Sequence, residues 1–218
     1  MKKSLLLLIP LILGLGACTN PKTPDTPDIP DTPDTPDWGE TATYTISFRG
    51  DKSRTGWSGG SQISNPTFKN ALEELVNNQT NNSLIALDGD KCAAQPVGEN
   101  DTTLTIGSGS SEGYVYFTFS LDIVEIDATI QNYHKVYNGG FSLDSEAEVT
   151  MCSYSPAGSG TVIEGKEVNL LVTDTTAIPD ERQESLELKE KANTIAFFNN
   201  DAQHRTFIHS LTITYVVE

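Results

Sequence analysis

A proline stands at every third position of residues 23–37, and this tract divides the chain into parts that must fold separately. The tract reads TPD-TPD-IPD-TPD-TPD, five tripeptides in register. Each proline fixes φ at about −65° and disfavours the α region for the residue before it, so helices and sheet interiors are excluded here. We predict a stalk over residues 18–37, in which residues 23–37 form an extended polyproline II segment that rises about 3.1 Å per residue and is kept solvated by its aspartates.

The residues before the stalk have the pattern of an export signal. Lys2 and Lys3 come first, an apolar run from Leu5 to Leu13 follows, and Leu15-Gly16-Ala17-Cys18 closes the segment. The run is shorter than the about 20 apolar residues that a transmembrane helix needs. Small residues directly before a cysteine resemble the lipobox of bacterial lipoproteins, in which the cysteine thiol receives a diacylglycerol.

This resemblance implies cleavage after residue 17 and an acylated Cys18 as the mature N-terminus. We therefore expect a lipid-anchored protein of the bacterial cell membrane or outer membrane, with its domain outside the cytoplasm. The alternative is an ordinary signal peptide in which Cys18 has no special role.

Lipidation of Cys18 leaves two cysteines, Cys92 and Cys152, in the exported domain. An even number of cysteines outside the cytoplasm is compatible with a disulfide. The other interpretation is a pair of buried free thiols, because free cysteine is among the most buried residue types. The sequence does not place the two Cα atoms within bonding distance, so both interpretations stay open.

Residues 38–218 form the expected domain and carry most of the negative charge. The whole chain has 30 acidic and 14 basic side chains and a formal net charge of −16. Residues 1–37 contribute five aspartates and three lysines, so the domain keeps 25 acidic and 11 basic side chains, a net charge of −14. This excess argues against a nucleic-acid partner, since such binding rests on cations that neutralise phosphates.

The hydrophobic pattern of the domain has the period of two that is typical of strands. Polar and apolar side chains alternate over residues 43–48, and similar runs are separated by turns rich in glycine, asparagine or proline. These runs cover residues 102–106, 113–121, 123–130, 147–152, 168–172, 186–188, 194–198 and 207–217. Many short strands of this kind favour an all-β fold, an antiparallel β-sandwich. In the last run we expect one side to face the core, made up of Phe207, His209, Leu211, Ile213, Tyr215 and Val217.

One segment has the period of an amphipathic helix. Asn65 is a plausible N-cap and Pro66 suits the first helical position. Phe68, Leu72 and Val76 follow at helical spacing, with charged side chains between them. We predict one short helix of about three turns that packs on the sandwich.

Several stretches of the second half of the domain match a known pattern. They are LTIGS at 104–108, EGYVYF at 112–117, Ile126, Asn132-Tyr133, NTIAF at 193–197, RTFI at 205–208 and LTITY at 211–215. Together they are similar to bacterial lipoprotein domains with a jelly-roll sandwich, the galactose-binding-like fold of carbohydrate-binding modules. The resemblance covers about half of the chain. It implies a noncatalytic binding module for glycan or another extracellular ligand, such as a surface protein, and it carries over no ligand-binding residue.

Sugar binding uses exposed aromatic rings that stack on pyranose faces, beside polar side chains that bond the hydroxyl groups. Four aromatic residues lie in or beside predicted loops, and they are the candidate ligand-binding residues: Trp57, Tyr133, Tyr137 and Tyr154. Each of them has an alternative role in the core.

The domain also carries motifs that suit metal binding or catalysis. Asp88 and Asp90 follow an apolar run and form a candidate calcium loop, with a solvated turn as the alternative. Residues 56–60 satisfy the G-x-S-x-G pattern around Ser58, but the flanking strand and helix of a nucleophile elbow are missing from the sequence pattern. His204 and His209 point to opposite faces of a predicted strand, so we do not expect them to share zinc.

Three functions are compatible with the sequence. The first is the binding module, with no cofactor apart from structural calcium at Asp88 and Asp90. The second is a glycan or ester hydrolase that uses Ser58 or paired carboxylates, and the third is a structural envelope component that binds protein. We favour the first, and with it a protein that is not an enzyme.

Overall fold

A computed structural model describes residues 36–57, 60–137 and 140–217 of the chain. The export signal, Cys18, most of the stalk and Ser58 lie outside the described residues. In the described part of the chain, no helix is long and apolar enough to span a membrane.

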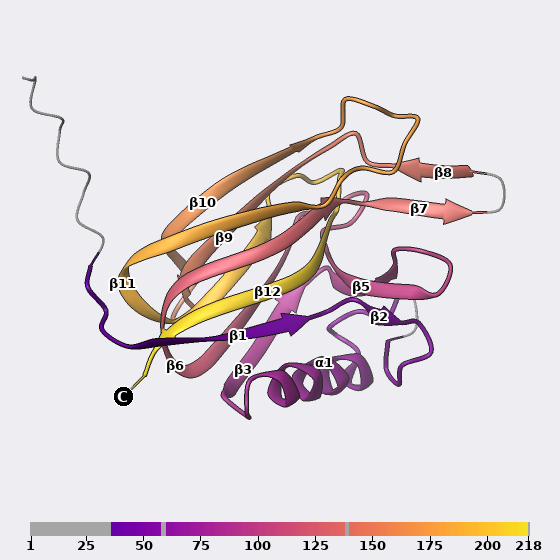
Figure 1. Ribbon diagram of the computed structural model, residues 1–218. Helices are drawn as coiled ribbons and strands as arrows, with labels where there is room; N and C mark the ends of the chain where they lie inside the picture. Colours follow the sequence, from indigo (N-terminus) through magenta and orange to yellow (C-terminus); the bar gives the residue numbers. More distant parts are fainter. Residues whose placement is uncertain (1–35, 58–59, 138–139, 218) are drawn as a thin grey trace, which may run out of the picture. The chain divides into compact units, whose positions relative to one another are not determined.

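The described part consists of strands and one helix, in the order shown in Figure 1. The elements are β1 (Thr41–Ser47), β2 (Gly50–Asp51), α1 (Pro66–Gln79), β3 (Leu84–Asp90), β4 (Cys92–Pro96), β5 (Asp101–Ile106), β6 (Gly113–Asn132), β7 (His134–Tyr137), β8 (Gly140–Leu143), β9 (Glu146–Ser155), β10 (Thr161–Leu171), β11 (Arg182–Asn199) and β12 (Thr206–Val216). Every strand pair is antiparallel.

Strands β6 and β11 pass from one layer of the fold into the other. The first half of β6 pairs with β3 on one side and with the second half of β11 on the other. The second half of β11 pairs in turn with β9, and β9 pairs with β10. The second half of β6 lies between the first half of β11 and β12, and β12 pairs in turn with β1 and β5. The register of β6 and β11 shifts between Glu187 and Thr194, where the strands bend. The predicted all-β antiparallel sandwich with one helix is confirmed.

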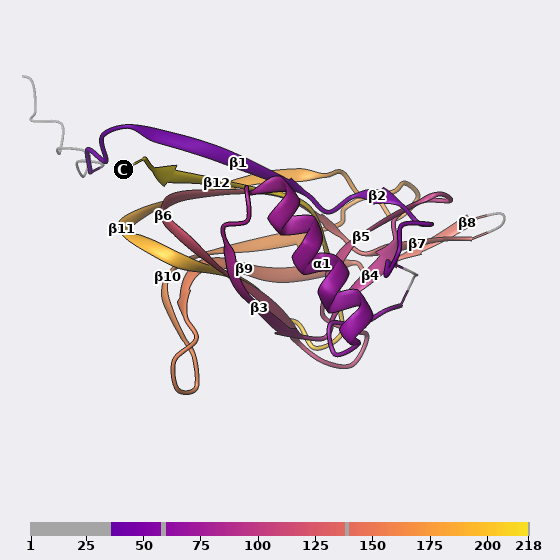
Figure 2. The same cartoon turned by 90° about the horizontal axis from the view of Figure 1, so that it is seen from below.

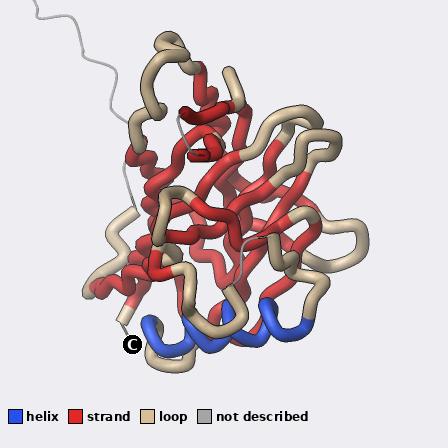
Figure 3. The backbone as a smooth tube through the Cα atoms, turned by 90° about the vertical axis from the view of Figure 1, so that its right-hand side faces the viewer, coloured by secondary structure: helices blue, strands red, loops and turns tan. Residues whose placement is uncertain are grey.

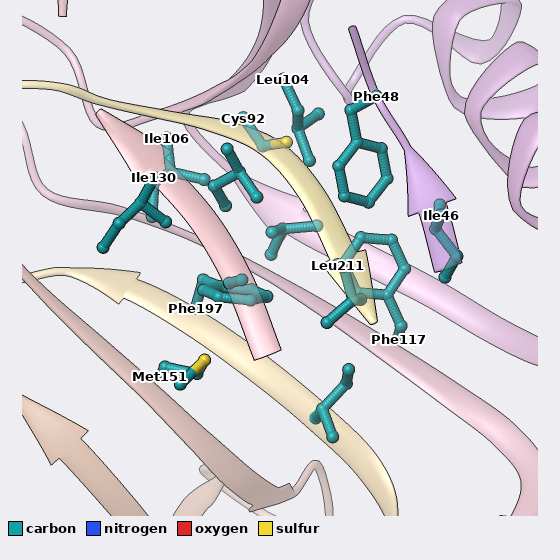
Figure 4. Packing of buried hydrophobic residues seen from close by; sticks show 14 of the residues in the cluster. Ile46, Phe48, Cys92, Leu104, Ile106, Phe117, Ile130, Met151, Phe197 and Leu211 are labelled. Atoms are coloured by element: carbon teal, nitrogen blue, oxygen red, sulfur yellow. The ribbon is translucent and has the colours of Figure 1, made fainter. Parts of the chain in front are cut away.

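A single large apolar core fills the space between the layers. Figure 4 shows Phe117, Phe197 and Leu211 meeting in this core from three different strands. Residues that precede or follow them in the strands point the other way, as the alternation of a half-buried strand requires. Burial of these side chains is the main favourable contribution to folding, about 25 cal/mol per Å² of apolar surface.

Helix α1 forms where the sequence predicts it. The Asn65 side chain accepts a hydrogen bond from the Thr67 backbone N–H at 2.9 Å, and Pro66 stands in the first turn. Phe68, Leu72 and Val76 are buried, and the helix packs beside β1 and β3. Figures 2 and 3 show the helix lying along the outside of the strand layers.

The prediction for the closing strand is wrong at both ends. At its beginning the strand contains a β-bulge. The register of β12 against β6 shifts between Ile208 and Ser210, and the extra residue is His209. Ile208, Leu211 and Ile213 therefore face the large core. Phe207 instead joins a small cluster with Val97 and Tyr133 on the opposite face.

At the end of β12 the register against β6 shifts again, between Thr214 and Tyr215. Tyr215 is only half-buried, and Val217, which follows the strand, is 41% exposed, so neither belongs to the large core.

The disulfide interpretation is also corrected. Cys92 and Cys152 are both free and both fully buried. The Cys92 side chain belongs to the large core, whereas Cys152 follows the inward-facing Met151 in β9 and donates its thiol hydrogen to the Ala196 carbonyl. Burial raises the pKa of both thiols, so both are protonated at neutral pH.

Candidate ligand-binding site

Four half-buried aromatic rings form a closed cluster on the outer face of one layer. Tyr114 and Tyr116 come from β6, Tyr154 from β9 and Phe198 from β11. The ring centroids are 6.5 Å apart for Tyr114 and Tyr116, and 5.6 Å apart for Tyr116 and Tyr154. Phe198 completes the cluster, at 5.3 Å from Tyr154 and 5.7 Å from Tyr114. Each ring therefore contacts two others.

Strand alternation explains why these rings point outward. Val115 and Phe117 are buried in the core, so Tyr114 and Tyr116 occupy the opposite face of β6. Tyr114 stands opposite Phe198 in the register of β6 and β11, and Tyr116 stands opposite the small residue Ala196. The small neighbour leaves room for the Tyr154 ring beside Tyr116.

A polar pocket of about 540 Å³ adjoins the aromatic cluster, and Tyr154 belongs to both. The pocket lies where β6 and β11 bend between the layers. It is lined by Asp122, Ser153, Tyr154, Ile163, Glu164, Lys189, Glu190, Lys191, Ala192 and Asn193. Lys191 Nζ lies 3.1 Å from an Asp122 carboxylate oxygen, and the Lys189 backbone N–H donates to Glu164 at 2.8 Å. The pocket thus offers both donors and acceptors.

Asp88 and Asp90, the candidate calcium ligands, lie beside the tyrosines. In the register of β3 and β6, Asp88 stands opposite Tyr116 and Asp90 opposite Tyr114. Both carboxylates are exposed, and Asp90 lies 3.6 Å from Lys91 Nζ. Calcium binding by these residues stays a prediction.

Burial, together with the charge of Asp88, raises the pKa of Tyr114 and Tyr116. Both phenols are therefore neutral at physiological pH and keep their hydrogen for donation. The cluster combines apolar ring faces with neutral hydroxyl donors and nearby carboxylate acceptors. This combination of groups suits a ligand with apolar faces and a hydroxyl-rich rim.

Of the four aromatic residues predicted as ligand-binding, Tyr154 alone lies in this site among the side chains that the structure describes. Trp57 is 1% exposed and packs edge-on against Phe68, with their ring centroids 5.1 Å apart. The Arg54 guanidinium covers the Trp57 ring. Tyr133 is 5% exposed and lies under Arg205. Trp57 and Tyr133 are thus packing residues. Tyr137 lies in β7, and its side chain is outside the described part of the chain.

Sequence reasoning missed Tyr114, Tyr116 and Phe198. The available signal was the run at 113–121, in which aromatic residues occupy both faces of one predicted strand. In a half-buried strand one face is expected to be polar, so two tyrosines on that face mark an exposed aromatic surface. Phe198 carried no comparable signal, because Phe197 beside it is equally apolar.

The histidines are not grouped with this site. His209 is buried, and its Nε2 lies 2.8 Å from Gln131 Oε1. His134 is buried too, with its Nε2 3.1 Å from the Val97 carbonyl oxygen. In the segment after β11, the His204 Nδ1 atom lies 2.6 Å from Asp201 Oδ2. His204 lies before β12 begins, whereas His209 lies within that strand.

No family model and no curated protein matches the chain. Among solved structures, a family 29 carbohydrate-binding module from Piromyces equi is similar over 81% of this chain and 92% of its own, with 9% identity and a TM-score of 0.42. The K2 adhesin domain of Lys-gingipain is similar over 79% of this chain and 99% of its own, with 12% identity and a TM-score of 0.40. The carbohydrate-binding module TmCBM61, solved with β-1,4-galactotriose, matches 61% of this chain and 88% of its own, with 9% identity and a TM-score of 0.34.

Proposed function

We propose that this chain is a noncatalytic carbohydrate-binding module of the bacterial cell surface. The observation that carries the proposal is the closed cluster of Tyr114, Tyr116, Tyr154 and Phe198, which shares Tyr154 with a polar pocket. Four half-buried rings on the solvent side of a sheet are more than a soluble domain needs for packing.

The proposed ligand lays the apolar face of a sugar ring against the aromatic cluster. The hydroxyl groups around its edge bond the tyrosine hydroxyls and the polar side chains of the pocket. Because Tyr154 contacts both parts, a ligand of two or more sugar units would engage the rings with one unit and the pocket with the next. The charges of the pocket lining and of Asp88 and Asp90 favour a neutral glycan over an acidic one.

We further propose that Cys18 carries the lipid anchor and that residues 18–37 hold the domain away from the membrane. The support comes from the sequence, in which the apolar run, the small residues before Cys18 and the proline tract follow in order. In the bacterial host, Cys18→Ala should remove metabolically incorporated palmitate from the protein. Equal palmitate in Cys18→Ala and the unchanged chain would disprove the anchor.

A glycan array probed with the full chain purified in detergent tests the binding function. We expect signals on neutral glycans that fall at least about tenfold in affinity, or about 1.4 kcal/mol, for Tyr116→Ala. The matched control is Tyr215→Ala. It removes one ring of a second stacked pair, Tyr44 on β1 and Tyr215 on β12, whose ring centroids are 5.0 Å apart. Absence of signal on every glycan, or an equal loss in both variants, would overturn the proposal.

A further inference from the structure

A second group of polar side chains gathers where β9 begins and β11 ends. Glu146 opens β9, while Asp201 and His204 stand in the segment that joins β11 to β12. One potential ligand atom from each residue lies within 4.8 Å of the other two. Glu146 is exposed, and Asp201 and His204 are half-buried, so the group is open to solvent on one side.

The charges of this group are not balanced by neighbouring cations. One oxygen of the Asp201 carboxylate accepts a hydrogen bond from the Gln203 backbone N–H at 2.7 Å. The other oxygen lies within hydrogen-bond distance of His204 Nδ1, at 2.6 Å. Among the described residues, the Glu146 side chain has no hydrogen-bond or ion-pair partner, while its backbone pairs with Leu171 of β10. The nearest arginine in sequence, Arg205, is already paired with Asp144. Two carboxylates therefore lie close together with a single imidazole beside them.

The backbone around the group is held in place by other elements. The buried Asn199 side chain donates to the carbonyls of Ile106 at 3.2 Å and His204 at 2.8 Å. The Asn200 backbone N–H donates to the Glu148 carbonyl at 2.9 Å. The three side chains consequently come from a frame that does not depend on an ion, which lowers the cost of arranging them around one.

We propose that Glu146, Asp201 and His204 bind a divalent transition metal of the zinc type, with water completing its coordination. An imidazole nitrogen with two carboxylate oxygens is a donor set that zinc accepts, whereas calcium takes six to eight oxygens and does not favour nitrogen. The ion neutralises the facing carboxylates, and the bond between His204 and Asp201 is exchanged for two bonds to the metal.

The metal site is distinct from the aromatic cluster, although both lie on β9. Glu146, Glu148, Thr150 and Tyr154 share the outer face of this strand, with Glu146 and Tyr154 at opposite ends. The proposal does not rest on carbohydrate binding. A bound ion would join the start of β9 to the segment between β11 and β12, and it would stabilise the folded state by mass action.

The test uses the full chain purified in detergent, stripped with EDTA and titrated with zinc chloride in a calorimeter and in a thermal unfolding assay. We expect one ion per chain and a melting temperature that rises with zinc. Glu146→Gln and His204→Ala should each weaken zinc binding at least about tenfold. The matched control, Glu148→Gln, makes the same charge change on the same strand and face, and it keeps a side-chain oxygen that can accept from the Asn200 amide. It should bind zinc as the unchanged chain does.

Cobalt(II) gives a second readout, because its visible absorption reports coordination by the protein directly. The spectrum should be lost in His204→Ala and kept in Glu148→Gln. Melting temperatures in EDTA show that each variant folds. Absence of zinc binding by the unchanged chain, or equal zinc affinity in Glu146→Gln, His204→Ala and Glu148→Gln, would overturn the proposal. Calcium binding without zinc binding would also overturn it.

Discussion

The rings of Tyr114 and Tyr116 lie parallel, with an interplanar angle of 2° and centroids 6.5 Å apart. Two residues separated by one position in a strand project from the same face, so this pair is a direct product of strand geometry. The pair becomes a candidate site because Phe198 and Tyr154 close the cluster from neighbouring strands. Local geometry thus supplies half of the aromatic surface, and strand pairing supplies the rest.

Tyr154→Phe tests which part of Tyr154 the ligand uses. We expect glycan affinity to fall only slightly, within about threefold, because the ring that stacks is retained. Tyr154→Ala should lose at least about tenfold, since the ring shared by the cluster and the pocket is removed. Isothermal titration with a glycan identified on the array measures both. A larger loss in Tyr154→Phe than in Tyr154→Ala would contradict a stacking role.

Phe197 and Phe198 are neighbours in β11 with opposite roles, and they provide a matched pair of variants. Phe197 is fully buried in the core, so Phe197→Ala should lower the free energy of unfolding by about 3–5 kcal/mol. Phe198→Ala should cost clearly less stability but should weaken glycan binding. Urea unfolding and calorimetric titration separate the two effects. Equal destabilisation by both variants would place Phe198 in the core as well.

Stability should fall as the pH drops below about 6.5, because His209 and His134 are buried in neutral form. Burial lowers the pKa of His209 to about 4 and also lowers the pKa of His134. Glu181, Arg49 and His134 are the charged or titratable groups that act on His209. Between about pH 6.5 and pH 4 the unfolded chain binds more protons than the folded chain, so acid favours unfolding.

The neutral, buried His209 contributes about 3 kcal/mol to the free energy of unfolding near neutral pH, and this contribution is fully lost below about pH 4. Urea midpoints measured from pH 8 to pH 4 give the slope. His209→Gln, which keeps a donor for Gln131, should flatten this slope. An identical slope in His209→Gln and the unchanged chain would rule out His209 as its source.

Asn65→Ala should destabilise the domain by about 1 kcal/mol, because the Asn65 side chain caps the first turn of α1. Asn65→Ser should recover most of the loss, since serine accepts the same hydrogen bond. Thermal or urea unfolding measures both variants. If serine and alanine are equally destabilising, the cap contributes nothing measurable and the helix is held by its buried side chains alone.

The prediction of the helix succeeded because its signals are local. Asn65, Pro66 and the spacing of Phe68, Leu72 and Val76 are all visible within a short stretch of sequence. The prediction that His209 faces the large core together with Leu211 failed, because a β-bulge depends on how β12 pairs with β6. Trp57 and Tyr133 illustrate the same limit. Each lies near a predicted loop, yet other parts of the chain cover both of them.

The sequence by itself determined the all-β class and the single helix, because a period of two and a capped period of 3.6 are properties of neighbouring residues. Only the tertiary structure decided which side chains meet. Phe198 joins Tyr114 through strand register, and Glu146 joins His204 through the approach of β9 to the end of β11. Such contacts depend on pairing between distant segments, and a shift of one residue in that pairing would turn every ring to the opposite face.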